Sequence, residues 1–281
     1  MKKFFPHLKI LVAATVFFAL TSCNSKKEDE NNAVLQDTAS KKVTSKDTNN
    51  FFYSLPSPLL MTKVFKKTGV KYMEGIANSC DNVSKYTSNQ SMTLNLGVYS
   101  TDLAYAVLNK QTQQATKYME SIKKLSDGLG MSPLFNADYF LTRFKNNLGN
   151  EDSLILVVAQ LKEEMDVFLK DNGKEKQTLM IFVGAWVENM YIATQLTKED
   201  NKEKIVARVA EQKDILHSLM NVTTNFQNDN DFKDTYLKLT ELKTLFDNLT
   251  VQGEDEKVTM NEAQWKAIKE KTNNFRKDIV G

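Results

Sequence analysis

The hydrophobic positions between residues 51 and 281 follow a helical pattern along nearly the whole region. Apolar side chains recur every three or four residues, the spacing that places them on one face of an α-helix. Strict alternation of apolar and polar residues, which is typical of a half-buried strand, is rare. The pattern therefore predicts an all-α fold. One of its clearest stripes consists of Leu154, Val157, Val158, Leu161, Met165, Phe168 and Leu169.

Proline and glycine divide this region into about nine predicted helices. Ser57 before Pro58, and Ser132 before Pro133, each place a capping residue ahead of a proline at the first helical position. The first helix is expected to split near Gly69 or Gly75. We expect a multi-helix bundle or an array of helical hairpins. The predicted helices cover residues 58–86, 91–109, 112–128, 133–148, 151–171, 175–197, 201–220, 230–250 and 259–279.

A weak similarity between two of these helices points to an internal repeat. A shift of 86 residues places Asp102 on Glu188. The same shift relates residues 65–148 to residues 151–234, which predicts two four-helix units within one helical domain, 51–281. Under this shift, Gly97 and Gly184, which precede the two carboxylates, are out of alignment by one position. The alternative is that helices of one bundle simply resemble each other.

The predicted helices 91–109 and 175–197 carry almost no charge. Between Leu94 and Leu108 the only charged residue is Asp102, and between Thr178 and Leu196 it is Glu188. A helix that is apolar on all sides is covered on all sides, so both are expected at the centre of the fold. Both also contain glycine and alanine, which would let neighbouring helices approach closely.

Asp102 and Glu188 are the candidate functional carboxylates. In one hypothesis they flank a shared cavity, where they could bind a cation or a polar ligand. Two carboxylates across a cleft also suit general acid and base catalysis on a glycoside. The other residues of this candidate site are Tyr99, Tyr105, Trp186 and Tyr191.

The competing hypothesis gives the two carboxylates a structural role. A carboxylate in a dry interior must be paired or hydrogen-bonded, and otherwise it takes up a proton. Each carboxylate could accept hydrogen bonds from a tyrosine hydroxyl, from Asn189 or Thr101, or from a lysine, and so fix how the helices pack. We favour this hypothesis over ligand binding, and ligand binding over catalysis.

Composition limits the chemistry further. His217 is the only histidine after residue 22, which is too few for a histidine-rich metal site. Cys80 lies in no recognisable motif, so we expect a small buried residue rather than a nucleophile. Phosphate-binding glycine loops, Cys-x-x-Cys pairs and Gly-x-Ser-x-Gly are absent. We therefore expect no metal, no cofactor and no enzymatic activity, with a hydrolase using Asp102 and Glu188 as the alternative.

The first 22 residues have the layout of an export signal rather than of a folded element. Lys2, Lys3 and Lys9 precede an apolar stretch, Ile10 to Leu20, that is too short to span a bilayer. The sequence Leu-Thr-Ser-Cys that ends at Cys23 resembles a bacterial lipobox. By this resemblance, 1–22 is a type II signal peptide and Cys23 carries acyl chains. An ordinary signal peptide with an accidental cysteine is the alternative.

Residues 23–50 are predicted to form a disordered tether between the lipid and the helical domain. They lack aromatic residues and contain few bulky aliphatic ones, so they cannot bury enough surface to offset the entropy of ordering. Lys27-Glu-Asp-Glu30 resembles the charged signal of surface-exposed lipoproteins of Bacteroidota, and a plain solvated charge run is the alternative. Removing the three lysines of 1–22 takes the formal charge from +2 to −1. That near-neutral balance argues against nucleic acid as a partner.

Taken whole, the chain resembles the helical lipoproteins of unknown function found in Bacteroidota. The resemblance lies in the lipobox, the polar tether and a helical body marked by glycine and tyrosine, and it implies no catalytic residues. It predicts an outer-membrane lipoprotein, held through its lipid and exposed either at the cell surface or to the periplasm. The expected partner is an envelope protein or a small-molecule ligand. A structural spacer within an envelope complex is a third hypothesis.

Overall fold

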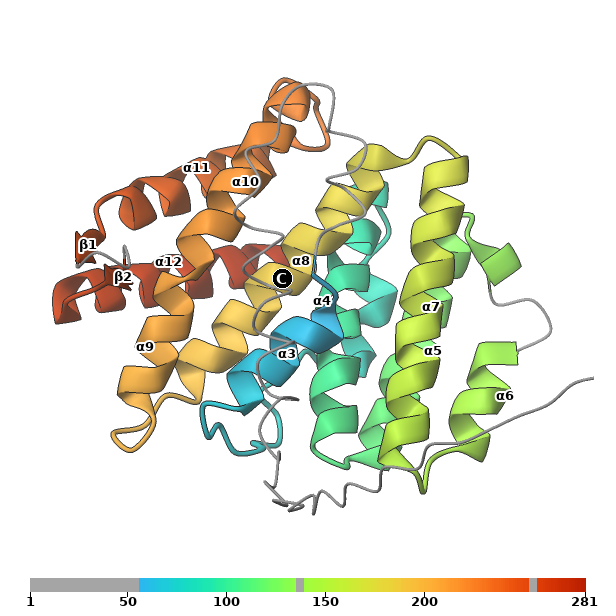
Figure 1. The fold of residues 1–281 in the computed structure, drawn as a ribbon. Coiled ribbons are helices and arrows are strands. Elements are labelled where there is room, and N and C mark those ends of the chain that lie inside the picture. Colours follow the sequence, from blue (N-terminus) through green and yellow to red (C-terminus); the bar gives the residue numbers. More distant parts are fainter. Residues whose placement is uncertain (1–55, 135–138, 253–256) are drawn as a thin grey trace, which may run out of the picture.

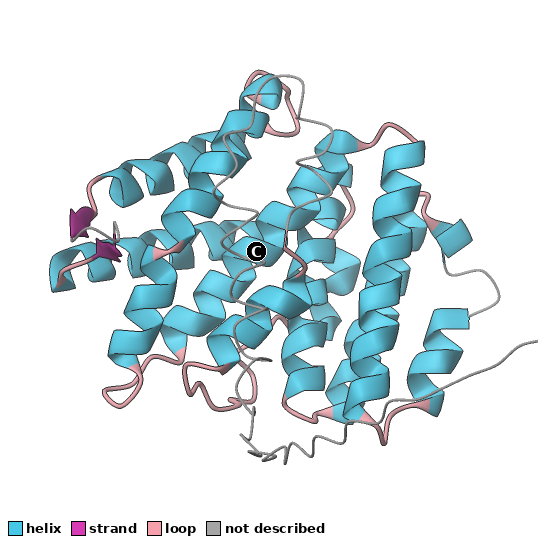
Figure 2. Ribbon diagram, viewed as in Figure 1, coloured by secondary structure: helices cyan, strands magenta, loops and turns pink. Residues whose placement is uncertain are grey.

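A computed structural model describes residues 56–134, 139–252 and 257–281. Helices make up almost all of this structure, so the predicted all-α, multi-helix fold is confirmed (Figures 1 and 2). The predicted signal peptide and tether lie outside the described residues. Within the described ranges, no helix is both long and apolar enough to cross a membrane.

The elements follow one another along the chain with short connections. They are α3 (Pro58–Lys66), the 3-10 helix η1 (Cys80–Lys85), α4 (Asn89–Leu108), α5 (Thr112–Gly128), α6 (Tyr139–Asn146), α7 (Glu151–Asp171), α8 (Glu175–Gln195), α9 (Lys202–Ala210), α10 (Gln212–Thr223), the 3-10 turn η3 (Thr224–Phe226), α11 (Lys233–Asp247), the strands β1 (Thr250–Gln252) and β2 (Lys257–Thr259), and α12 (Glu262–Val280).

The first predicted helix, 58–86, is wrong in length. Ser57 caps α3 as expected, since its hydroxyl accepts a hydrogen bond from the Leu60 amide at 3.1 Å. The helix nevertheless ends at Lys66. Gly69 and Gly75 then have φ angles of +94° and +78°, a left-handed backbone that no helix continues through. The chain from there to η1 forms an irregular loop over the ends of α4 and α5.

Two other predictions also need correction. The single helix expected over 201–220 is two helices, α9 and α10, which meet at Glu211. The break expected after residue 250 contains an antiparallel pair of strands, with Thr250 opposite Thr259. Of the helix expected over 133–148, residues 133 and 134 lie in a 3-10 turn, Tyr139–Asn146 is an α-helix, and 147 and 148 form a turn.

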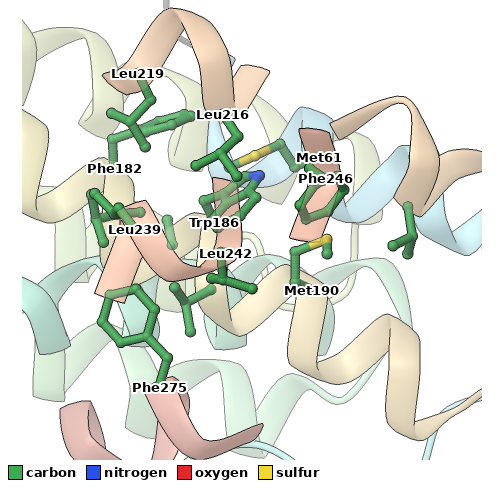
Figure 3. Packing of buried hydrophobic residues seen from close by; sticks show 14 of the residues in the cluster. Met61, Phe182, Trp186, Met190, Leu216, Leu219, Leu239, Leu242, Phe246 and Phe275 are labelled. Carbon is green, nitrogen blue, oxygen red and sulfur yellow. The ribbon is translucent and has the colours of Figure 1, made fainter. Parts of the chain in front are cut away.

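The core contains two large hydrophobic clusters, one around each central helix, and a small third one that includes Tyr105. The first, here called the Trp186 cluster, joins α8 to α3 and to α9–α12 (Figure 3). The second, the Phe140 cluster, joins α4 to α5, α6 and α7. Figure 1 shows the corresponding halves on the two sides of the central helices. The predicted central positions of α4 and α8 follow from this, because each is buried on several sides.

The helix that precedes each central helix in the chain packs into the cluster around the other central helix. Helix α3 leads into α4, yet its Met61 and Phe65 lie in the Trp186 cluster. Helix α7 leads into α8, yet its Leu154, Val157 and Leu161 lie in the Phe140 cluster. The two halves therefore interlock, and neither cluster is built from one continuous stretch of chain.

Helices α4 and α8 touch through their backbones. A Cβ atom added to Gly97 would lie 1.9 Å from the Ile181 carbonyl oxygen, and one added to Gly184 would lie 2.0 Å from the Leu94 carbonyl oxygen. Farther along, the Thr101 hydroxyl donates to the Ala185 carbonyl at 3.1 Å. Residues 94–97 of one helix therefore meet residues 181–184 of the other, and Thr101 then meets Ala185. Since the contacts move toward the C-terminus of both helices, α4 and α8 run in the same direction.

The two glycine contacts are equivalent to each other. Gly97 and Gly184 are 87 positions apart, and so are Leu94 and Ile181. Gly97 meets the carbonyl of Ile181, three residues before Gly184, and Gly184 meets the carbonyl of Leu94, three residues before Gly97. The two contacts are therefore related by a local two-fold axis. The relation involves one crossing, so the longer repeat, 65–148 with 151–234, remains a prediction.

The crossing yields a stability prediction. Gly97→Ala and Gly184→Ala should each destabilise the protein by about 3 kcal/mol or more, because the new methyl group would displace backbone atoms rather than a flexible side chain. Gly149→Ala is the control, since a Cβ there has nothing within 4 Å. Denaturant unfolding of the three variants tests this. Equal stability of the Gly97 and Gly149 variants would contradict the close crossing.

Candidate functional site

Asp102 and Glu188 lie beside each other in the interior, just past the glycine crossing. Asp102 projects from α4 and Glu188 from α8, and both residues have 0% of their surface exposed. Each helix thus brings one carboxyl group to the same place, since Glu188 acts directly on the charge of Asp102. The functional hypothesis placed these carboxylates on two sides of a shared cavity. They meet in a closed interior rather than across an open cleft.

Arg276 of α12 neutralises Glu188. The Arg276 Nε donates to Glu188 Oε2 at 2.9 Å, and Nη2 donates to Oε1 at 3.1 Å. This two-point pairing uses the planar fork of the guanidinium, which matches the geometry of a carboxylate. Although burial opposes the charged guanidinium, the Glu188 carboxylate raises the pKa of Arg276 above its usual value. The ion pair links the central helix α8 to the last helix of the described chain.

Asp102 forms no ion pair of its own with any residue that the structure describes. Its Oδ2 accepts a hydrogen bond from the Asn78 backbone N–H at 3.2 Å. Its Oδ1 is buried and receives no hydrogen bond from any described residue. The Glu188 side chain lies directly beside it and acts on its charge. Two adjacent carboxyl groups can bond to each other only if one of them carries a proton, and a proton on Oδ1 would let Asp102 donate to Glu188.

The electrostatics agree with a protonated Asp102. Burial and then the adjacent Glu188 carboxylate raise the pKa of Asp102 well above its usual value, and Arg276 and the Asn78 N–H oppose the shift only in part. The group of three is thus neutral overall, with one negative carboxylate, one neutral carboxyl and one guanidinium. This arrangement avoids two adjacent buried negative charges.

Tyr191 covers the outer side of this group. The Arg276 guanidinium carbon lies 4.4 Å from the centroid of the Tyr191 ring, a cation–π contact. The Arg276 side chain is 14% exposed, whereas that of Glu188 is 0% exposed. Arg276 and Tyr191 therefore separate the carboxyl groups from solvent.

The neighbouring polar residues form a separate network. Asn189 donates to the Thr101 hydroxyl at 3.0 Å and accepts from the Thr62 hydroxyl at 2.9 Å. These bonds join α8 to α4 and α3. Asn189 and Thr101 are two of the partners that the structural hypothesis offers the carboxylates, beside tyrosine hydroxyls and lysines, and they are hydrogen-bonded to each other instead.

The remaining residues of the candidate site are dispersed. Trp186 lies in the Trp186 cluster (Figure 3). Its indole N–H donates to the side chain of Gln212 at 3.0 Å. Tyr99 is fully buried and donates to the Ser79 carbonyl at 2.8 Å. Tyr105 lines a surface pocket under the loop that precedes η1. The six residues therefore do not converge on one cavity.

The other candidate side chains show no sign of reaction chemistry. Cys80 is partly buried, and burial raises the pKa of its thiol, which disfavours the reactive thiolate. His217 lies 2.5 Å from Asp247 in a partly exposed pair between α10 and α11. Across the described ranges, no group of three or more His, Cys, Asp and Glu side chains could hold a metal ion.

Sequence reasoning missed Arg276, the residue that organises the site. The chain has 34 lysines and only three arginines, and buried ion pairs favour arginine. Arg276 also follows Phe275 directly and lies between Thr272 and Ile279 on the buried side of α12. Those two signals together could have identified it, although neither indicates its partner 88 residues away.

Comparisons with known proteins add no relationship to this geometry. No protein-family model matches the sequence, and no curated protein or solved structure is significantly similar to it. The interpretation of the site therefore depends on its own contacts.

Removing Arg276 tests the site directly. Arg276→Ala leaves two adjacent carboxyl groups without a cation, and we expect a loss of about 3 to 5 kcal/mol of unfolding free energy. Arg276→Lys should recover part of this loss, because the charge returns without the two-point geometry. Arg208→Ala, which breaks an exposed pair with Glu211, is the control and should cost under about 1 kcal/mol. Similar losses at both arginines would contradict the proposed role.

The raised pKa of Asp102 gives a pH prediction. Because the folded state holds a proton that the unfolded state releases, this contribution is complete at low pH, below the pKa of the unfolded Asp102, and is lost as pH rises through the folded pKa. Asp102→Asn keeps a donor to Glu188 without needing a proton. Its stability relative to the wild type should therefore increase with pH, by up to about 1.4 kcal/mol per pH unit.

Denaturant unfolding between mildly acidic and alkaline pH measures this difference. Asp200→Asn, at an exposed position of the connection before α9, is the matched control and should show no such trend. A constant difference between Asp102→Asn and the wild type at all pH values would rule out the shared proton.

Proposed function

We propose that this chain is a lipid-anchored envelope protein whose helical body binds or supports another component and performs no catalysis. The observation that carries the non-catalytic part is the closed group of Asp102, Glu188 and Arg276. A general acid or base must come within hydrogen-bond reach of a substrate atom. Asp102 and Glu188 expose no surface and are occupied by each other and by Arg276.

The same geometry argues against the glycosidase alternative. Inverting and retaining glycosidases keep space between their two carboxyl groups for a sugar ring and, in inverting enzymes, a water. Here the two groups lie directly beside each other and neither exposes any surface. Opening that space would require parting helices whose backbones are already in contact at Gly97 and Gly184. The arrangement instead suits a fixed joint among α4, α8 and α12.

The anchor is supported by the sequence. Lys2 and Lys3, the short apolar stretch and Cys23 occur in the order and spacing of a lipoprotein signal. Two or more acyl chains hold a protein stably on a membrane, because each buried methylene contributes about 0.8 kcal/mol. Lys27 to Glu30 then favour the outer surface of the outer membrane as the location. We infer a body attached to the membrane by its lipid alone.

Metabolic labelling with an alkyne-tagged palmitate tests the anchor. Wild-type protein expressed in a Gram-negative host should be labelled and should sediment with membranes. Cys23→Ser should lose the label and move to the soluble fraction. The chain supplies its own control, since Cys80→Ser should keep both the label and the membrane association. Label that persists in Cys23→Ser would overturn the assignment of the anchor.

A further inference from the structure

A second site lies away from the buried carboxyl groups, in a surface pocket of about 220 Å³. It is formed where the loop after α3 crosses the end of α4 and the first turns of α5. Residues from all three segments line it. Those that matter most are Tyr72 and Glu74 of the loop, Tyr105 of α4, and Gln114 and Tyr118 of α5.

The aromatic wall of the pocket is held in place. The rings of Tyr72 and Tyr105 are stacked, with centroids 5.4 Å apart and planes 28° apart. The Tyr105 hydroxyl accepts a hydrogen bond from the Met73 backbone N–H at 2.8 Å, which ties the loop to α4. Tyr118 packs against Tyr99 at 6.0 Å. The tyrosines therefore need little rearrangement to receive a ligand, which lowers the entropic cost of binding.

The polar groups around the tyrosines are mostly engaged already. The Tyr105 hydroxyl accepts a hydrogen bond from the loop backbone, and Gln114 donates one to the Cys80 sulfur. Burial raises the pKa of both Tyr105 and Tyr118, so their phenols stay neutral. A ligand that depends on many hydrogen bonds, such as a sugar, would find few free partners here.

Glu74 sets the charge of the pocket. Among the described residues that line the pocket it is the only one with a charged side chain, and it is exposed. It lies close enough to Tyr72 to act with burial in raising the pKa of that phenol. An anionic ligand would be repelled, and a metal ion would find a single carboxylate. A small cation with an apolar surface would meet both the Glu74 carboxylate and the half-buried ring of Tyr72.

We propose that this pocket binds a small organic cation of the alkylammonium class. The half-buried Tyr72, backed by the buried Tyr105 and Tyr118, lies beside one carboxylate. This pairing matches the recognition of such ligands, in which the ring quadrupole attracts the positive charge and the apolar ring covers the methyl groups. Met73, 45% exposed on the same loop, adds a flexible apolar edge to the rim. This gives the proposed non-catalytic body a ligand, and it requires neither the lipid anchor nor the buried carboxyl groups.

Calorimetric titration of the purified full chain with choline tests this. The matched probe is the neutral isostere of choline, in which a tert-butyl group replaces the trimethylammonium. Choline should bind at least about tenfold more tightly than the isostere, because only choline carries the charge that the rings and Glu74 attract. Equal binding of the two probes, or no binding of choline at millimolar concentration, would overturn the proposal.

Variants at the pocket locate the site. Glu74→Gln should weaken choline binding about tenfold and leave the isostere unchanged. Tyr72→Leu should weaken it similarly, whereas Tyr72→Phe, which keeps the ring, should not. Glu203→Gln, at an exposed position of α9, makes the same change of charge elsewhere and should have no effect. A Glu74→Gln affinity equal to that of the Glu203→Gln control would place the cation outside this pocket.

Two further experiments distinguish a lipid head group from a free cation, and a failure of the pocket proposal from a failure of the anchor proposal. Vesicles of phosphatidylcholine should compete with free choline if the pocket accepts a lipid head group, and should not if it accepts only the free cation. Vesicles of phosphatidylglycerol are the control. Cys23→Ser should bind choline like the wild type. The proposal of a lipid anchor and the proposal of a cation-binding pocket can therefore be refuted independently of each other.

Discussion

The contact between Gly97 and Gly184 is the constraint on which the rest of the structure depends. With no side chain between them, α4 and α8 approach until backbone atoms of one helix touch the other. That separation brings two carboxyl groups, one from each helix, into the same dry space a turn farther on. Since neither can be solvated there, the fold must supply a proton and a cation. The loop that seals Asp102 and the helix that carries Arg276 meet this requirement.

The last described helix therefore does more than cover the core. Besides Arg276, it offers two backbone carbonyls to the central region: Asn95 donates to the Ile279 carbonyl at 2.8 Å, and Tyr86 donates to the Val280 carbonyl at 3.2 Å. Asn78 in turn donates to the Tyr86 hydroxyl while its backbone binds Asp102. One continuous set of polar contacts thus joins the loop, both central helices and α12 through the interior between the two hydrophobic clusters.

The sequence predicted much of the fold because local signals decide helices. The α7 prediction, 151–171, matches the observed bounds, where a clear apolar stripe lies between Asn150 and Gly173. Prediction failed where backbone geometry or distant contacts decide. The left-handed glycines end the first helix early, and the hairpin at Thr250–Thr259 is too short to show a strand pattern. Within the candidate site, Trp186 and Glu188 are two residues apart on one helix, so they project about 200° from each other. Because α8 is apolar on nearly all sides, its sequence pattern does not reveal which side of the helix each residue faces.

The placement of the cation also couples distant segments during folding. Until α12 docks, the crossing would bury an acidic pair without its counter-charge, and the Trp186 cluster would lack Trp265, Ile268 and Phe275. Arg276 reaches Glu188 from 88 residues away in the chain, so the central joint depends on a contact that forms only when α12 is in place. Because that contact closes a long loop, we expect the two halves to form together rather than one after the other.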